Sequence, residues 1–258
     1  VSDNVKLTSI TSFRGQDVDF EGDVDFTSAR LVASNRQITS ANSFTQELRA
    51  NFDLNDRANV TLGGFYFKDD LETDTNLIYG DDFRPFADYV VYQLQYADFL
   101  AGGSAPFPLG GALNLVEAFS PPGTSYFAPG QGLGVGFEQD NEALSLFGQV
   151  DFDVTDRLTA SGGLSYVEDK KTVTSNSTST DQFSALNLST FLGGAVEALV
   201  PLQFLPPFMD FPNAVEGNKS NDDKITYSAR LAYDVKDNIN VYASVGTGFK
   251  ASTFNLSR

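Results

Sequence analysis

Three segments of the chain repeat one pattern, and this repetition limits the possible folds more than any other feature. Residues 43–70, 143–170 and 226–250 each contain a run of alternating apolar and polar side chains, then Asp-apolar-x-Asp, then a second alternating run that includes glycine. A period of two is typical of β-strands, because successive side chains point to opposite faces. A short polar turn between two such runs predicts a β-hairpin. The predicted turns are Asp53–Arg57, Asp153–Arg157 and Asp234–Asn238.

The alternation keeps one phase within each hairpin and extends over strands of about ten to twelve residues. Soluble sheets use strands of about five to six residues, whereas a tilted strand that crosses a membrane needs about 9–11. In a membrane-spanning strand, lipid-facing and lumen-facing side chains must alternate. The pattern predicts that Phe52, Leu144, Val150, Leu231 and Val241 face lipid and that Arg49, Asp151 and Arg230 face the barrel interior.

The connections between the predicted strands are very unequal. Turns within the hairpins are short, whereas the links between hairpins cover about residues 70–141 and 171–223. Short turns at one end and long loops at the other are the layout of outer-membrane barrels. The expected fold is all-β: antiparallel transmembrane β-barrel strands forming a partial barrel, with short periplasmic turns and long extracellular loops carrying short helices. We expect all three turns at one end of the sheet. A soluble or secreted all-β protein is the alternative.

The composition excludes several classes of function. The 258 residues include no His and no Cys, which excludes the ordinary zinc, copper and iron–sulfur sites, Cys nucleophiles and Ser-His-Asp triads. A formal charge of −17 argues against nucleic acid as a partner. No run of 18 or more apolar residues is present, so no transmembrane helix is expected. We expect no catalytic residues, no metal site and no cofactor.

The third hairpin carries the most specific motif. Its sequence, "YSARLAYDVKDNINVYASVGTGFKASTFN", resembles the barrel hairpin of TonB-dependent receptors, whose members often read close to Y-D-V-T-D-x-x-x-V-Y-A-S-x-x-x-G-F-K-S-G-G-F-N. Ser252-Thr253 stands where the family has Gly-Gly. The N-terminal "VKLTSITSFRG" and the two earlier hairpins also resemble barrel strands of this family, so the resemblance covers most of the chain. The matching residues are Tyr233, Asp234, Val235, Asp237, Val241, Tyr242, Ala243, Ser244, Gly248, Phe249, Lys250, Phe254 and Asn255.

The resemblance implies a transport receptor in the outer membrane of a Gram-negative bacterium, not an enzyme. Such receptors actively take up scarce ligands such as ferric siderophores, cobalamin or oligosaccharides, with energy from the TonB complex delivered through an N-terminal plug. Plugged transporters have about 22 strands, whereas residues 1–258 contain about seven predicted strands and nothing that resembles the plug. We therefore expect a central fragment of the barrel domain. Its expected partners are outer-membrane lipid, the TonB complex through a plug absent from this chain, and a small-molecule or oligosaccharide ligand.

Other functions also fit the strand pattern. A passive porin-like outer-membrane channel would show the same alternation but would have no plug. A secreted, self-associating β-structural protein would stack its hairpins against other chains instead of against lipid. A carboxylate-based glycosidase is a more distant alternative, because no pair of acids lies in a convincing cleft context.

The acidic stretch "GQDVDFEGDVDF" at residues 15–26 has two interpretations. The motif D-x-D-x-E-G that begins at Asp17 resembles the start of an EF-hand calcium loop, but its twelfth position is Ser28, where a bidentate Glu is needed. The alternative is a strand with its acids on one face. Apolar residues occupy odd positions before Gly15 and even positions after it, so this strand requires a β-bulge near Gly15. We expect the strand, with the acids facing the lumen or the extracellular rim and Val18 facing lipid.

In the first long loop, "ADYVVYQLQYADFLAGG" places four aromatic side chains at helical spacing. Such a stripe could stack on a sugar ring or an aromatic siderophore, or it could only pack a loop helix against its neighbours. The later run of alternate glycines, residues 130–136, lacks the strand-before and helix-after context of a phosphate loop and predicts a flexible return to the next strand. The candidate ligand-binding residues are Tyr89, Tyr92, Tyr96 and Phe99.

Overall fold

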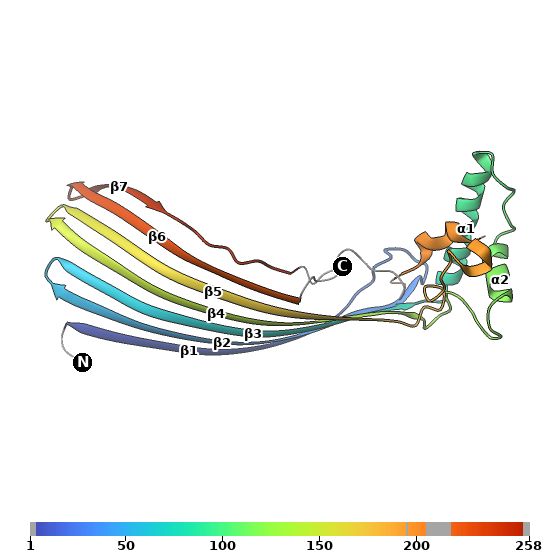
Figure 1. Cartoon of the computed structure of the whole chain (residues 1–258), viewed down its shortest axis with the longest axis horizontal. Coiled ribbons are helices and arrows are strands. Elements are labelled where there is room, and N and C mark those ends of the chain that lie inside the picture. The colour runs from blue at the N-terminus through green and yellow to red at the C-terminus, as the bar shows by residue number, and fades with distance from the viewer. Residues whose placement is uncertain (1–3, 195, 205–217, 255–258) are drawn as a thin grey trace.

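The strands of the chain form one antiparallel sheet in which each strand pairs with the next one along the sequence. The computed structural model describes residues 4–194, 196–204 and 218–254 (Figure 1). The sheet is thus an up-and-down meander without crossovers among these residues. The strands are β1 (Val5–Glu21), β2 (Val32–Asn55), β3 (Ala58–Tyr79), β4 (Gly132–Thr155), β5 (Leu158–Ser179), β6 (Lys219–Lys236) and β7 (Ile239–Gly246).

The three predicted hairpins are present, and their turns share one geometry. Two residues connect the strands in each hairpin, and the register shifts just before each turn, so that Leu54, Val154 and Val235 are left out of the pairing. The turns lie together at one end of the sheet, which we call the turn end, at the left of Figure 1. The long connections lie at the opposite end, which we call the loop end. The predicted placement of turns and loops is confirmed.

A repeated aspartate supports each turn. Its side chain accepts a hydrogen bond from the residue directly across the hairpin. In the second and third hairpins its backbone N–H donates to the preceding turn: the Asp153 amide to the Arg57 carbonyl at 2.8 Å, and the Asp234 amide to the Arg157 carbonyl at 2.9 Å. Neighbouring turns are therefore linked. The side-chain pairs are Asn59 Nδ2 to Asp53 Oδ1 (2.5 Å), Thr159 Oγ1 to Asp153 Oδ1 (2.6 Å) and Asn240 Nδ2 to Asp234 Oδ1 (2.7 Å).

The strands are longer than the alternating pattern indicated. β2 and β4 have 24 residues each, and β3 and β5 have 22 each. The extra residues lie at the loop end, where backbone pairing continues through mostly polar sequence on β3 and β5 and through Leu133, Val135 and Phe137, alternating with glycines, on β4. The long connections therefore cover residues 80–131 and 180–218 rather than about 70–141 and 171–223. Gly132, Gly134 and Gly136, expected in a loop, belong to β4.

The register divides the sheet into an apolar face and a polar face. Phe52, Val60 and Val150 stand opposite one another on adjacent strands and share the apolar face. The other three positions predicted to face lipid follow the same parity, and the positions predicted to face the interior lie on the polar face. The separation of the two sets is confirmed. The apolar face holds Phe52, Leu144, Val150, Leu231 and Val241, and the polar face holds Arg49, Asp151 and Arg230.

The acidic stretch belongs to a strand, but not in the predicted way. β1 pairs with β2 from Val5 to Glu21 with no register shift at Gly15. The predicted bulge is wrong, because continuous backbone pairing with β2 fixes the phase of β1 whatever its side chains are. Asp17 consequently lies on the apolar face, beyond its apolar residues, and Val18 lies on the polar face.

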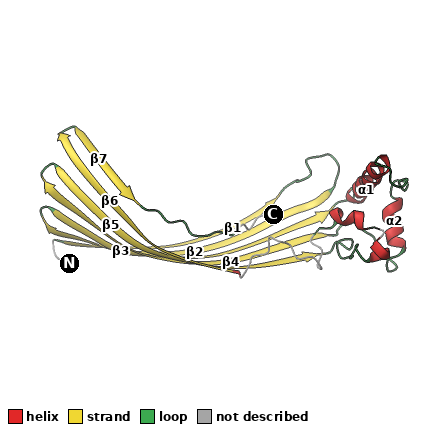
Figure 2. Cartoon of the chain, turned by 45° about the horizontal axis from the view of Figure 1, so that its top comes forward, coloured by secondary structure: helices red, strands yellow, loops and turns green. Residues whose placement is uncertain are grey.

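Helices occur only at the loop end among the described residues, as the red elements of Figure 2 show. α1 (Phe83–Leu100) confirms the helix expected from the aromatic spacing. It ends before Gly102, whose φ of 97° is the left-handed conformation that glycine adopts after many helices. None of the described helices is long and apolar enough to cross a membrane. The other helices are α2 (Gly111–Ala118) and two 3₁₀ turns, η1 (Phe191–Gly194) and η2 (Glu197–Leu202).

Candidate functional site

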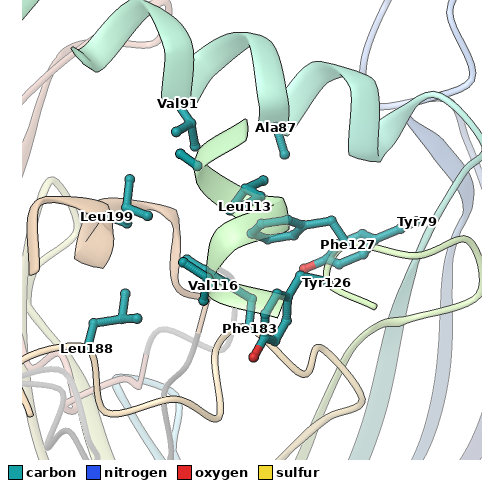
Figure 3. Packing of buried hydrophobic residues seen from close by; sticks show 11 residues of the cluster. Tyr79, Ala87, Val91, Leu113, Val116, Tyr126, Phe127, Phe183, Leu188 and Leu199 are labelled. Carbon is teal, nitrogen blue, oxygen red and sulfur yellow. The ribbon is translucent and has the colours of Figure 1, made fainter. Parts of the chain in front are cut away.

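The two long connections pack against each other at the loop end. We call this unit the loop cap: residues 80–131, 180–194 and 196–204. Phe183 of the second connection contacts Tyr126 and Phe127 of the first, with ring centroids 5.3 Å and 4.8 Å apart (Figure 3). The cap therefore has a hydrophobic core of its own, which the end of β3 joins. Its buried members are Tyr79, Ala87, Val91, Ala112, Leu113, Val116, Tyr126, Phe127, Phe183, Leu188 and Leu199.

A charged network holds α1 against α2. The Arg84 guanidinium donates to the carboxylate of Glu117, to Asp88 Oδ1 at 3.1 Å, to Asn114 Oδ1 at 2.8 Å and to the Tyr126 carbonyl at 3.2 Å. The charged side chains are only 17–20% exposed. Burial disfavours the charged form of Arg84. The hydrogen bonds and negative charges of Glu117 and Asp88 outweigh this effect and raise the pKa of the guanidinium. The network fixes α1, and with it the aromatic stripe.

A buried carboxyl group anchors the second connection. Asp181 is 2% exposed. Its carboxylate accepts hydrogen bonds from the Phe183 amide at 3.0 Å and from the Ser184 hydroxyl, and Ser184 Oγ accepts one from the Phe204 amide at 2.6 Å. Burial raises the pKa of Asp181, although these hydrogen bonds oppose the rise. Burial, together with the charge of Asp181, also raises the pKa of Tyr79. Titration of Asp181 is thus linked to packing of the cap.

The structure brings the four predicted ligand-binding residues together on one side of α1. Tyr89, Tyr96 and Phe99 are 54%, 42% and 45% exposed, and Tyr92 is half-buried. The rings of Tyr92 and Tyr96 have centroids 6.2 Å apart and planes 15° apart, and Phe99 follows at 6.4 Å from Tyr96. The helix buries other residues in the cap core. Tyr92, Tyr96 and Phe99 form a continuous row of rings, and the exposed Tyr89 lies on the same side of the helix; the four together are called the aromatic stripe.

Where the structure describes the chain, the stripe is a surface rather than the wall of a pocket. Only Tyr92 of the four reaches the tight crevice between α1 and residues 108–113. A hollow of about 810 Å³ lies elsewhere, on the apolar face of the sheet over Leu48, Leu62 and Gly64. A ligand of the stripe therefore either binds to an exposed surface or is enclosed by residues from other parts of a receptor.

The family-motif residues lie away from the stripe, since β7 and α1 are at opposite ends of the molecule (Figure 1). On the polar face, the Arg230 guanidinium stands 4.5 Å from the ring centre of Tyr242, which is a cation–π contact. The motif thus contributes to the sheet rather than to the cap. Tyr242 and Ser244 belong to β7, Gly248, Phe249 and Lys250 follow it without regular structure, and Asn255 lies outside the described residues.

The acids of residues 15–26 pair locally. Asp19 accepts two hydrogen bonds from the Arg36 guanidinium, at 2.8 Å and 2.5 Å. Asp25 accepts hydrogen bonds from Thr27, which lower the pKa of its carboxyl group. Among the described residues, no group of acids is placed to hold a metal ion.

The Arg84 network and the burial of Asp181 were not predicted from the sequence. Arg84 and Asp88 stand four positions apart in a helical stretch, so their ion pair was detectable from spacing. Glu117 and Asp181 gave no such signal, because their roles depend on contacts between separate segments.

A comparison with protein families shows the family to which the chain belongs. The family model described as "TonB dependent receptor-like, beta-barrel" matches residues 2–257. Among solved structures, the ferric yersiniabactin uptake receptor FyuA from Yersinia pestis is similar with a TM-score of 0.57 and 16% identity. The alignment covers 100% of this chain and 28% of the FyuA chain. At this identity the similarity shows the fold alone.

Two further comparisons add little. A FadL homologue from Pseudomonas aeruginosa aligns over 95% of this chain and 45% of its own at 13% identity, but the TM-score of 0.33 is too low to support an argument. No curated protein sequence matches the chain. The chain spans well under half the length of FyuA.

Proposed function

Because the chain belongs to the family of TonB-dependent receptor β-barrels, we propose that it forms part of the wall of an outer-membrane receptor that actively takes up a scarce ligand. The family expected from the third hairpin and the expected all-β fold are both confirmed. The proposed location is the outer membrane of a Gram-negative bacterium. The proposed ligand is a siderophore, a cobalamin or an oligosaccharide, and the proposed energy source is the TonB complex acting through a plug. No enzymatic activity is proposed.

One observation carries the proposal: an exposed apolar band crosses all seven strands on one face. On β4 the band extends from Leu144 to Phe152, which matches the about 9–11 residues that a tilted strand needs to cross a membrane. A soluble protein rarely leaves so large a continuous apolar surface uncovered. One member from each strand, with its exposed fraction, is Leu7 (63%), Leu48 (57%), Leu62 (51%), Leu146 (53%), Leu164 (60%), Leu231 (55%) and Val245 (64%).

Toward the loop end the band gives way to charged side chains, which begin on β5 and β6 with Glu168 and Asp223 in the row of Leu144. On the same face, Lys68, Glu142 and Lys170 form one row across three strands, and Asp70 and Asp140 form the next. Charges on a lipid-facing surface are costly at the bilayer centre and tolerated near its edge. The border therefore supports a membrane surface at this row. The strands continue beyond it and would carry the loop cap outside the membrane.

The opposite face suits a water-filled interior. It presents Arg49, Asp151 and Arg230 at the height of the band, together with many Ser and Thr residues. Polar interiors are typical of large outer-membrane barrels. The two faces together support a wall between lipid and an aqueous lumen.

The loop cap supports the receptor part of the proposal. It is an ordered unit with its own core, and it exposes the aromatic stripe on α1. Long ordered connections are usually functional. We therefore propose that Tyr89, Tyr92, Tyr96 and Phe99 form part of the outer ligand-binding surface.

Two rivals predict different results. A passive porin-like channel would use the same wall but would transport without TonB. A secreted self-associating β protein would cover the apolar band with other protein chains and would need no lipid. Spin labels at Leu48 and Arg49 of the complete receptor in lipid vesicles show which of the two positions faces lipid and which faces the aqueous lumen. The label at position 48 should be the more accessible to lipid-dissolved oxygen, and the reverse result would refute the proposed wall.

Energy coupling needs a separate test. Cells that contain the complete receptor should lose uptake of its ligand when TonB is deleted or the proton gradient is collapsed. Uptake that continues unchanged would favour the porin-like alternative. A receptor with Tyr92→Ala and Tyr96→Ala should show weaker uptake while its level in the outer membrane stays constant.

A further inference from the structure

Among the described residues, nearly all of the net charge lies toward the loop end. The described parts of residues 14–43, 68–143, 168–204 and 218–224 contain 23 of the 31 described acids and 9 of the 16 described bases. Their net charge of −14 leaves only −1 for the other described residues. Lys250, on the segment that returns from β7 toward this end, changes the imbalance by a single charge. Charge of one sign at one end creates a field that attracts cations and repels anions.

The two long connections have no unpaired base to bind an anion where the structure describes them. Their described residues, within 80–131 and 180–204, contain seven acids and one base, Arg84. Arg84 is already paired with Asp88 and Glu117, and its side chain is 17% exposed. Arg30, in the link between β1 and β2, contacts the cap but is paired with Asp81 at 3.3 Å. An anionic ligand would lose water at the cap without gaining an opposite charge from either connection, which is unfavourable.

The same cap exposes rings that can bind a cation. Tyr96 and Phe99 are 42% and 45% exposed, and the planes of Tyr92 and Tyr96 differ by only 15°. A cation within about 6 Å of a ring centroid is attracted by the ring quadrupole, and at an exposed site this improves affinity about 2–5-fold per ring. Apolar packing alone would account for the rings but not for the charge imbalance.

We propose that the loop cap selects a cationic ligand with a flat apolar body. The body stacks along Tyr92, Tyr96 and Phe99, and the acids of the loop end draw the positive charge toward the cap. This inference rests on the proposed function and deepens it, because it names the charge class of the ligand that the outer surface takes.

Two dyes of the same shape test the charge selection. Rhodamine 6G is cationic and fluorescein is anionic at neutral pH, and both have a xanthene ring system. Their binding to the complete receptor in lipid nanodiscs can be followed by fluorescence anisotropy, with empty nanodiscs as the control for lipid partitioning. Rhodamine 6G should bind about tenfold or more tightly than fluorescein at low salt, and the ratio should shrink at roughly 0.5 M NaCl. Equal or tighter binding of fluorescein would overturn the proposal.

Matched variants test the assigned surface. The double variant Tyr92→Leu/Tyr96→Leu keeps apolar contact but removes two rings, so rhodamine 6G should bind about 4–20-fold more weakly. Phe119→Leu is the control, because Phe119 lies on the same cap outside α1 and is 61% exposed. The Phe119→Leu receptor should bind rhodamine 6G with the same affinity as the wild type. If the double variant binds normally but melts at a lower temperature, the stripe packs against other parts of the receptor and the assignment is wrong.

The exposed acids can be tested separately from the rings. Asp98→Asn combined with Glu197→Gln removes one exposed acid from each connection. This variant should bind rhodamine 6G about 2–3-fold more weakly and show a smaller salt dependence. An unchanged salt dependence would show that these connections do not attract the cation.

Failure of this inference is distinguishable from failure of the proposed function. A receptor that inserts with the expected spin-label pattern and needs TonB for uptake, but prefers fluorescein, contradicts only the charge class. A chain that does not insert contradicts the proposed function and the inference that rests on it.

Discussion

The sheet and the loop cap treat apolar side chains in opposite ways. On the apolar face of the sheet, Leu48 and Leu146 are 57% and 53% exposed, whereas Leu113, Phe183 and Leu188 in the cap are 0% exposed. The residue types are similar in the two regions. The difference lies in what covers them.

This difference indicates that the two regions are built for different solvents. The cap follows the rule for water-soluble domains, since it gathers apolar side chains from separate segments into a core. The sheet satisfies its backbone through the strand ladder and leaves its apolar side chains outward, which is favourable when hydrocarbon surrounds it. Stability of the cap should therefore depend on internal packing, and stability of the sheet on lipid.

The largest expected effect tests the cap side of this comparison. Phe183→Ala removes a ring that contacts Tyr126 and Phe127, and such core truncations cost about 3–5 kcal/mol. Hydrogen exchange of cap peptides should accelerate accordingly, while insertion of the sheet should be unchanged. Phe119→Ala, at a 61% exposed position, is the control and should have little effect. Loss of membrane insertion in Phe183→Ala would mean that insertion of the sheet depends on packing of the cap core, contrary to the comparison above.

The next effect tests the sheet. Val150 and Gln149 are adjacent on β4 but lie on the apolar and polar faces respectively. Val150→Arg should destabilise the folded, membrane-inserted state by about 2–4 kcal/mol, because it places a charge in the bilayer. Gln149→Arg should cost much less, since its side chain meets water. Folding can be titrated with denaturant in the presence of vesicles, and equal costs for the two variants would refute the assignment of faces.

A third prediction compares two ion pairs. Glu117→Gln weakens the partly buried bonds to Arg84 and should destabilise the cap by about 1–3 kcal/mol. Asp81→Asn breaks the exposed contact between Asp81 and Arg30, whose side chains are 69% and 65% exposed, and should change stability by less than about 0.5 kcal/mol. Hydrogen exchange of α1 and α2 measures both. A larger effect for Asp81→Asn would show that the cap depends on its rim rather than its interior.

The pH dependence of the cap is expected to follow Asp181. Burial raises the pKa of Asp181 above its ordinary value of 3.8, so the folded cap holds this proton more tightly than the unfolded chain does. The resulting stabilisation is complete below pH 3.8 and is lost as the pH rises through the raised pKa. Asp181→Asn cannot titrate, so its stability should improve relative to wild type from acid toward neutral pH. With a fluorinated phenylalanine at position 127, ¹⁹F NMR during urea unfolding measures the free energy of unfolding of the cap in both proteins. A difference between Asp181→Asn and wild type that stays constant with pH would contradict the prediction.

The sequence was sufficient for those parts of the fold that local patterns control. The hairpin turns, the two faces and α1 all follow from a period of two or of 3.6 residues, and each is confirmed at residues such as Val150, Arg230 and Tyr92. The aromatic stripe was also visible, because one helix carries all four rings. Its role in binding stays a prediction.

Features that depend on neighbouring segments were not predictable. The loop-end extension of β3 and β5 arises from backbone pairing through mostly polar sequence, which an apolar alternation does not reveal. The continuous register of β1 past Gly15 has the same cause. In the cap, the burial of Asp181 and the contact of Glu117 with Arg84 exist only after the two connections and two helices have packed.

The smallest expected effect concerns the turn end, where neither hydrocarbon nor a buried core contributes. Asn59 donates to Asp53, and Asn240 donates to Asp234 in the equivalent place of another hairpin. Because these bonds are exposed to solvent, Asn59→Ala and Asn240→Ala should each cost only about 0.5–1 kcal/mol, at the low end of the range for hydrogen bonds. The two costs should be similar in folding titrations with vesicles, since the turns share one geometry. The effect should also be nearly independent of lipid thickness, unlike that of Val150→Arg. A cost at either position as large as that of Val150→Arg would show that the turns, rather than the apolar band, determine whether the sheet forms, and the comparison of two solvents would then not describe this end of the molecule.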